Sequence, residues 1–497
     1  MKTLFTHLHA VGVRAAWLLP VWLAGCTAGP DFRPPVPPAD AGWVLPTTAQ
    51  TASAATDLGQ PQQWKDRMDL AAPWWRHLGS PQLDALIDEA LSASPTLAAA
   101  QATLRQAQEL QSAQTAALQL PRADLAVGSQ RQQTSPSAQG QAGLGRAFSL
   151  HSASVGVQYP LDLAGGNRRA LEGLAARTEH RRYQLEAARL GLAASVATAA
   201  IAQSRLAAQA EALQALVDNQ EQQEALARER VRLGHAMPDE LLALHAQREQ
   251  ARSGLPLLHK QRQQAGHLLA MLAGRAPGAA PLPAFTLGDF RLPEALPLVV
   301  PSELVRQRPD IQAAQALMQA ASADYGVAVA RLYPQIRLSA NLGSQALSTG
   351  ALFGGGSAVW ALVGQLTQSL FNPALPAERR AALAALDAAA ANYQAVVLEA
   401  LRGVADALRA VEGDADALAA LARADAAAQG SLQSMERQHA LGSASYLQLL
   451  VAQQQALQVR SNLVAAQAQR LADSALLFQA VGAGWEGAAS VAALEGR

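Results

Sequence analysis

The chain of 497 residues is long enough for two to four ordinary globular domains, but its composition favours helices that pack closely. Half of the residues are hydrophobic while only 4% are aromatic, because alanine, which buries little area per residue, supplies most of the apolar total. The 39 basic and 39 acidic residues balance. The charge therefore excludes a general nucleic-acid binder, which needs a positive excess.

Residues 1–25 have the pattern of an export signal. Lys2 and Arg14 supply a positive start, and the apolar run 15–24 that follows is interrupted by Pro20. This run is far shorter than the roughly 20 apolar residues that a membrane-spanning helix needs. We therefore predict a signal peptide, with a transmembrane anchor as the alternative.

The signal ends at Cys26, the single cysteine of the chain. The preceding residues Leu-Ala-Gly (23–25) resemble a bacterial lipobox, in which the chain is cut before the cysteine. The cysteine then carries an S-diacylglycerol and an N-acyl group, here expected to be N-palmitoyl. Several acyl chains anchor a protein firmly, whereas one does not. We predict lipidation of Cys26, with an incidental cysteine as the alternative.

The lipidated cysteine would begin a segment, 26–63, that is rich in Pro, Ala, Thr and Gly. This segment shows no apolar period. Such a composition predicts an extended tether that lies along a surface.

A tandem repeat organises the rest of the chain, because four landmarks of the first half recur about 210 residues later. The paired landmarks are 94–97 with 308–311, 121–122 with 334–335, 159–162 with 368–371, and 232–234 with 440–442. We predict a first repeat over 64–273, a linker over 274–300, a second repeat over 301–481 and a C-terminal tail over 482–497.

Each repeat contains two stretches of alternating apolar and polar residues, a pattern typical of strands. We expect strands at about 122–132, 150–161, 335–343 and 360–370. Roughly 9 to 11 residues with one apolar face suit a tilted membrane-spanning strand. A soluble hairpin packed on a helix would alternate in the same way and is the alternative.

Four strands cannot close a barrel, since roughly eight is the smallest common number. An open sheet edge is not tolerated in lipid. If these strands span a membrane, several copies of the chain must therefore share one barrel. Two copies would supply eight strands, and three would supply twelve.

Two proline-free runs, about 167–232 and 377–441, predict helices of unusual length. At 1.5 Å per residue each would be on the order of 100 Å long. Each run ends near a glycine, Gly234 or Gly442, the residue that most often reverses the chain after a helix. The expected return helices are 239–272 and 445–477. Each repeat would thus form a long antiparallel coiled coil, with a soluble bundle plus an appended hairpin as the alternative.

Three stretches resemble the TolC/OprM outer-membrane factors, particularly the lipoprotein branch (NodT type) that serves efflux pumps of the resistance-nodulation-division type. They are CTAGPDFRPP (26–35), PWWRHLGSPQLDALIDEALSASPTLAAAQATL (73–104) and PSELVRQRPDIQAAQALMQAASADYGVAVARLYPQIRLSANLG (301–343). The resemblance covers essentially the whole mature chain, and the third stretch is the most specific.

This resemblance implies a mainly α fold with a transmembrane β-hairpin pair. It implies a homotrimer whose twelve strands form one barrel in outer-membrane lipid, continued by a helical tunnel into the periplasm. An equatorial belt would be built from the segment after the tether, the linker around 274–301 and the region beyond Gly482. The implied partners are a periplasmic membrane-fusion adaptor and an inner-membrane pump, with no nucleic acid.

The resemblance also places the working sites at the helix tips. The expected adaptor-docking residues are Arg232, Leu233, Gly234, Leu441 and Gly442. The expected aperture residues are Tyr446, Leu447, Gln448, Leu450 and Val451. Relatives carry aspartates where this chain has Gln448 and Val451, so we expect closure by Tyr446, Leu447 and Leu450 with uncharged polar contacts.

Other polar residues near the tips have simpler interpretations. Asp239 and Glu240 begin a predicted helix, where acidic side chains favour the helix dipole. His235 and His439 lie near the two turns, and no metal-ligand spacing recurs around them.

The sequence predicts transport rather than catalysis. It contains none of the motifs GxxxxGK[ST], HExxH and GxSxG. We therefore expect no enzyme activity and no cofactor or metal besides the covalent lipid. The predicted function is a passive exit duct for small molecules, driven by a separate pump. The alternative is a structural envelope lipoprotein that does not conduct.

Overall fold

The computed structural model describes residues 28–35, 48–66, 68–135, 140, 145–279, 282–299 and 301–485, without the side chains of 302 and 303. Cys26 and the predicted signal 1–25 lie outside the described residues. The chain divides into two compact units. The strand unit comprises the described parts of 1–35, 103–181 and 314–393, and the hairpin unit comprises those of 36–102, 182–313 and 394–497.

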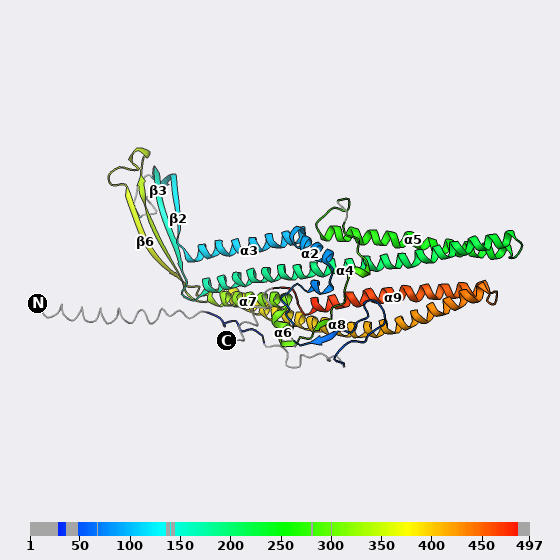
Figure 1. Ribbon diagram of the computed structural model, residues 1–497. Coiled ribbons are helices and arrows are strands. Elements are labelled where there is room, and N and C mark those ends of the chain that lie inside the picture. The colour runs from blue at the N-terminus through cyan, green and yellow to red at the C-terminus, as the bar shows by residue number, and fades with distance from the viewer. Residues whose placement is uncertain are drawn as a thin grey trace. The chain divides into compact units, whose positions relative to one another are not determined.

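The strand unit contains one antiparallel sheet of four strands in the order β2-β3-β5-β6 (Figure 1). The strands are β2 (Arg122–Thr134), β3 (Arg146–Leu161), β5 (Gln335–Ala346) and β6 (Ala358–Thr367). The four predicted strands are therefore present as two hairpins, one from each repeat. A short 3-10 turn, η5 (Thr349–Ala351), lies in the second hairpin.

Three of the four strands are longer than the expected 9 to 11 residues. β2, β3 and β5 have 13, 16 and 12 residues, because backbone pairing continues beyond the apolar band into polar ends such as Gln130–Gln133. β6 ends at Thr367 instead of about 370. The Gln368 side chain there donates to the Leu332 carbonyl (3.2 Å) in place of a strand partner.

The predicted long helices are α4 (Gly166–Arg232) and α8 (Ala374–Ala440), of 67 residues each. α8 begins three residues before the expected start because it includes Pro376, which the first turn of a helix tolerates. Two shorter helices precede the hairpins of strands, α3 (Pro95–Gln119) and α7 (Pro309–Ala330). α3, α4, α7 and α8 each contribute residues to both units.

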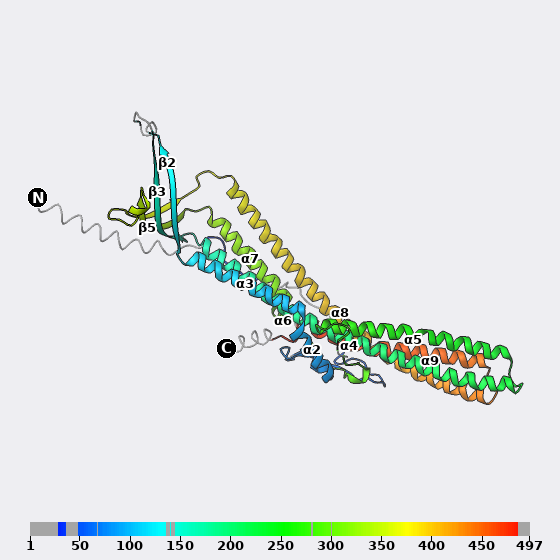
Figure 2. The same ribbon diagram turned by 90° about the horizontal axis from the view of Figure 1, so that it is seen from above.

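In the hairpin unit, α5 (Pro238–Leu272) returns along α4 and α9 (Tyr446–Ala480) returns along α8. Both views place the two turns at the same end of this unit (Figures 1 and 2). Polar bridges join the hairpins, since Gln453 donates to Asn219 (3.1 Å) and Gln209 donates to Ser461 (3.3 Å). The predicted antiparallel helical hairpins are thus observed.

A smaller part of the hairpin unit brings distant segments together. Strand β1 (Gln63–Lys65) pairs in parallel with β4 (Ala295–Pro297). Gly484 donates its backbone N–H to the Leu70 carbonyl (2.6 Å), and Trp485 donates to the Gln307 carbonyl (2.7 Å). The other elements here are η2 (Trp74–Leu78), α2 (Pro81–Ala93), η4 (Leu287–Asp289) and α6 (Pro301–Gln307). The three segments expected to build a belt therefore meet.

The predicted tether, 26–63, lies against the hairpin unit over its last dozen residues. Residues 51–62 fold against α9, where the fully buried Arg470 donates to Thr51 Oγ1 (2.9 Å) and the Gln60 carbonyl (2.9 Å). Gln62, also buried, donates to Ser474 (3.0 Å). The composition could not show this, because the partner residues Arg470 and Ser474 lie about 400 residues away in the sequence.

Candidate membrane and docking sites

The sheet has one apolar and one polar face, as its register shows. Leu125 lies opposite Val155, Val155 opposite Leu342, and Leu342 opposite Trp360. The neighbouring row on the other face is Asp124, Gly156, Asn341 and Ala361. Because directly opposed residues share a face, the alternation of the four strands is in phase across the sheet.

The apolar face is uncovered in the single chain. Leu125 is 74% exposed, Trp360 79% and Leu362 74%. β2 and β6 also form two unpaired sheet edges. An exposed apolar face combined with open edges is unstable in water, so both features need a partner surface.

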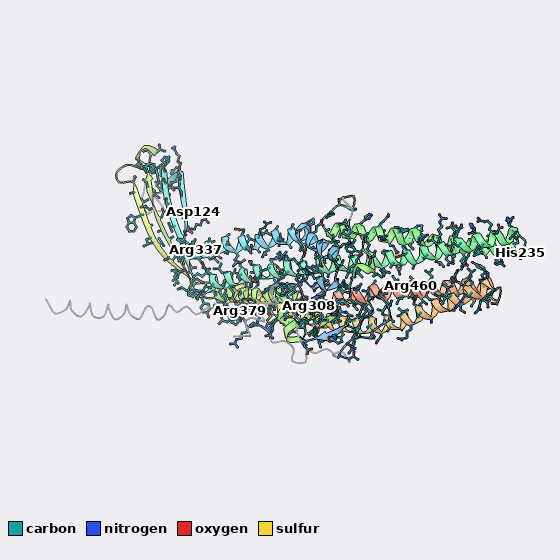
Figure 3. All side chains as sticks on the ribbon, in the orientation of Figure 1. Asp124, His235, Arg308, Arg337, Arg379 and Arg460 are labelled. Carbon is teal, nitrogen blue, oxygen red and sulfur yellow. The ribbon has the colours of Figure 1, made fainter. Side chains whose placement is uncertain are left out.

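The first tip is a tight turn built on Gly234. The Gly234 and His235 backbone N–H groups donate to the carbonyls of Val231 (3.0 Å) and Arg230 (2.8 Å). Gly234 has φ +76°, a conformation that side chains with a Cβ resist. Leu233 stands exposed beside it, and Figure 3 shows His235 at this end of the hairpin.

The second tip repeats this geometry around Gly442, whose φ is +75°. The Gly442 and Ser443 N–H groups donate to the carbonyls of His439 and Gln438, both at 2.9 Å. Leu441 is 83% exposed. The two turns therefore present equivalent Leu-Gly pairs at one end of the unit, which is where the sequence places adaptor docking.

The predicted aperture residues divide between two faces of α9. Leu447, Gln448 and Val451 are exposed, whereas Leu450 is buried and Tyr446 is half-buried against His439, with ring centroids 5.8 Å apart. Gln448 also closes a capping box by accepting from the Ser445 N–H (2.7 Å). In a single chain, three of the five predicted aperture side chains are therefore exposed, and another copy of the chain could contact them.

The charge of an acidic residue at the first tip affects the pKa of a tyrosine at the second tip. Burial, reinforced by the negative charge of Glu240 on α5, raises the pKa of Tyr446 on α9. Glu240 itself lies 3.7 Å from Arg230. Asp239 and Glu240 occupy the first turn of α5, as expected for acids that favour the helix dipole.

A cluster of charged and titratable side chains around the buried Glu224 joins α4 and α5 above the first tip. The Glu224 side chain on α4 is 4% exposed and lies 2.8 Å from both Arg228 and Arg248. His245 of α5 lies 3.5 Å from it. The cluster was not predicted from the sequence, although the i,i+4 spacing of Glu224 and Arg228 indicates an ion pair on one helix face.

The N-terminal segment 28–31 is clamped in the strand unit by Arg169, another residue that sequence reasoning missed. The Arg169 side chain is 6% exposed and lies 2.7 Å from both Asp31 and Glu172. It also donates to the carbonyls of Ala28 (3.3 Å) and Gly29 (3.4 Å). The Ala28 N–H donates to the Ala164 carbonyl (2.8 Å) just before α4. The chain is therefore held two residues after Cys26.

Glycine makes this clamp possible. A Cβ at Gly29, where φ is +83°, would lie 2.7 Å from the backbone of Gly326 on α7. A Cβ at Gly326 would lie 2.9 Å from the Arg169 side chain. The close approach of these two backbones therefore requires glycine at both positions.

A second buried arginine, Arg470, and the nearby Asp414 both have shifted pKa values. Burial lowers the pKa of Arg470 to about 10, although the nearby Asp414 opposes the shift. Burial, then hydrogen bonding and repulsion from Asp473, raises the pKa of Asp414 to about 7. Among the residues that the structure describes, no group of three or more His, Cys, Asp or Glu side chains could hold a metal ion.

The sequence model described as "Outer membrane efflux protein" matches this chain over residues 86–275 and 300–483. The chain belongs to the outer membrane efflux protein family. The two matched stretches correspond to the two repeats, each with its strand hairpin and its helical hairpin. The family resemblance and the tandem-repeat fold are thereby confirmed.

Relatives with known roles cover nearly the whole chain. The probable efflux pump outer membrane protein TtgC of Pseudomonas putida is 29% identical over 93% of both chains. The pyoverdine export outer membrane protein OpmQ of Pseudomonas aeruginosa is 30% identical over 86% of this chain and 92% of its own.

Solved structures agree with this family fold. The outer-membrane channel OprN superposes with a TM-score of 0.82 at 25% identity, over 93% of this chain and all of OprN. The open-state MtrE channel of Neisseria gonorrhoeae gives 0.78 at 26% identity, over 92% of this chain and 98% of MtrE. This efflux protein accordingly resides in the outer membrane.

Proposed function

We propose that three copies of this outer membrane efflux protein form one channel that acts as the passive exit duct of a tripartite pump. The observation that carries the proposal is the four-stranded sheet with an exposed apolar face and two open edges. β2 and β6 run antiparallel to one another, so copies can be joined edge to edge with the regular alternation of strand directions. Three copies would supply twelve strands and leave no edge.

The long helices support the same assembly. α4 and α8 each contain an 18-residue apolar stretch, of which 56% is buried in α4 but only 11% in α8. By length and composition alone either stretch could cross a membrane. In our proposal the alanine-rich surface of α8 instead packs against another copy, because alanine lets helices approach closely.

The hairpin tips would dock the periplasmic adaptor, through Arg232, Leu233, Gly234, Leu441 and Gly442. The equivalent turns and the exposed leucines support this assignment. Energy would come from an inner-membrane pump. The exposed Leu447, Gln448 and Val451 would meet around the three-fold axis and narrow the aperture, backed by Tyr446 and Leu450.

Lipid on Cys26 would complete the membrane attachment, and we propose no cofactor beyond it. The clamp on residues 28–31 would hold the acylated cysteine close to the start of α4. Two or three acyl chains beside a membrane-embedded barrel would make the anchor partly redundant for attachment and more important for delivery.

Conductance in planar bilayers tests the proposed channel. We expect discrete current steps from the purified protein or, if the resting aperture is closed, from Tyr446→Ala with Leu447→Ala. Leu362→Asp should weaken insertion, because a charged side chain on the lipid-facing side of a membrane strand is destabilising near the bilayer centre. Its neighbour Val363→Asp, on the polar face, should still form channels.

A different outcome would favour the alternative, a structural envelope lipoprotein. Such a protein would pass no current even with the aperture side chains removed. Equal loss of insertion for Leu362→Asp and Val363→Asp would also contradict the face assignment.

A further inference from the structure

We propose that the polar face of the sheet gives the channel a positively charged lumen that favours anionic cargo, with Arg337 as the principal determinant. This inference rests on the proposed function, in which that face lines a water-filled barrel. It assigns a class of solute to the duct.

The charged residues of the four strands are unevenly distributed. The strands contain a single acid, Asp124, and four arginines: Arg122, Arg131, Arg146 and Arg337. The register places Arg122, Arg146 and Arg337 on the same polar face as Asp124. Arg131 lies opposite Ser149 on the other face. The polar face therefore has a positive excess.

The single acid is already neutralised locally. Asp124 forms an ion pair with Arg122 at 2.9 Å on the same strand. Figure 3 labels Asp124 and Arg337 on the sheet. Arg337 lies on β5, two strands away from β2, and four residues along from Asn341, which shares a row with Asp124. Because Asp124 is already paired with Arg122, its charge does little to offset that of Arg337.

The neighbours of Arg337 leave its charge uncompensated. Its opposed residues are the uncharged Pro160 and Gln365, and within the described residues its side chain has no ion pair or hydrogen bond. It lines a cavity of about 500 Å³ at the foot of the strands, together with Asp162 and Arg331.

The other charges of this cavity have partners of their own. Asp162 accepts from the backbone N–H of Arg168 (2.9 Å), whose side chain lies 3.9 Å away. Arg331 lies 3.3 Å from Glu378. The net contribution of the cavity to the lumen is therefore the positive charge of Arg337.

The distance over which the Arg337 charges influence ions in the lumen depends on the salt concentration. In a trimer, three copies of Arg337 lie at one level of the barrel. The Debye length is about 30 Å at 0.01 M salt and about 3 Å at 1 M. The ring should therefore attract anions and repel cations across the lumen at low ionic strength, and have little effect at high ionic strength.

Reversal potentials in planar bilayers test the inference. With KCl at 10 mM on one side and 100 mM on the other, we expect the wild-type channel to prefer chloride. Arg337→Gln should reduce the chloride-to-potassium permeability ratio at least twofold, Arg337→Glu should reduce it further, and Arg337→Lys should preserve it. Arg131→Gln is the matched control, because it removes the same charge from the opposite face. All differences should vanish near 1 M KCl.

Two results would overturn the inference while leaving the proposed function intact. One is a wild-type channel that prefers potassium. The other is an Arg337→Gln channel that conducts with unchanged selectivity. Absence of current from every variant, including the one with the opened aperture, would instead contradict the channel function itself and the inference with it.

Discussion

Gly234 and Gly442 show how single residues define the working end of each helical hairpin. Both have φ near +75°, and no atom lies within 4 Å of the position that a Cβ would occupy. Glycine is therefore required at these positions by the backbone conformation and not by the packing of neighbouring atoms. A larger residue would have space, but it would strain the turn.

Gly442→Val should abolish docking of the adaptor, because a β-branched residue resists the left-handed conformation that the turn requires. Gly234→Val should act in the same way on the first turn. The measurement is cross-linking of the purified adaptor to each variant. Gly430→Val is the control, since Gly430 is exposed within α8 and has no positive φ. Undiminished cross-linking by both turn variants would contradict the prediction.

The ion pair between Glu229 and Arg232 at the first tip contributes little to stability. Hydrogen bonding from Arg232 lowers the pKa of Glu229, although both side chains lie in solvent. Exposed pairs of this kind contribute little stability. The distinctive property of the tips is therefore their shape together with exposed leucine, and not a strong charge.

At the scale of elements, the segment 28–31 and the start of α4 form one structural device. The clamp by Arg169 joins residues that are about 140 positions apart in the sequence. A nearly buried guanidinium that satisfies two carboxylates and two carbonyls is costly to disrupt, because its partners would remain unpaired.

Arg169→Ala should release this segment from α4. The expected measurement is a disulfide between Ala28→Cys and Ala164→Cys, whose backbone atoms are hydrogen-bonded at 2.8 Å. The disulfide should form in the otherwise unchanged protein and decrease several-fold with Arg169→Ala. Arg168→Ala, the neighbouring arginine outside the clamp, is the control and should leave it intact. Equal cross-linking in both variants would show that Arg169 does not hold the segment.

The sequence predicts where the strands and helices lie better than it predicts where they end. The positions of the strands and long helices follow from local periodicity, proline and glycine. Their ends differ where a tertiary contact decides, as at Gln368, or where proline is accepted in a first turn, as at Pro376. The clamp depends on contacts between elements, and so do the contacts of Glu224 with Arg248 and His245; only the Glu224–Arg228 pair is visible in a window of sequence.

At the scale of the whole molecule, α9 ties the second repeat to residues 51–62 through Arg470. The Asp414 carboxylate lies close enough to Arg470 to interact with its charge, and it forms a hydrogen bond with Asp473. In the folded chain burial and Asp473 raise the pKa of Asp414 above its ordinary value, to about 7. The folded state therefore binds a proton that the unfolded chain releases near pH 4.

This pKa shift predicts a loss of stability as pH rises. Between about pH 4 and 7 the folded chain holds more protons, so the free energy of unfolding decreases across this window. Asp414→Asn keeps a neutral hydrogen-bonding group and should raise stability at pH 8, by on the order of 1 kcal/mol after discounting for solvent exposure.

Thermal unfolding of the detergent-purified protein at pH 5 and pH 8 measures this effect. The melting temperature of Asp414→Asn should exceed that of the wild type only at pH 8. Asp416→Asn, at an exposed acid on the same helix, is the control and should show no such difference. A variant that is less stable than the wild type at pH 8 would refute the prediction.

The sequence by itself determined the duplicated mainly α architecture, the strand hairpins and the glycine turns, because periodicity and backbone restrictions act between residues close together in the chain. The alternation of the strand also placed Arg337 on the polar side, but only the tertiary structure showed that Arg337 lies there without a counter-charge and which arginines hold the N-terminal segments. Those properties arise when residues hundreds of positions apart are brought within a few ångströms, where burial and register set the balance of charge.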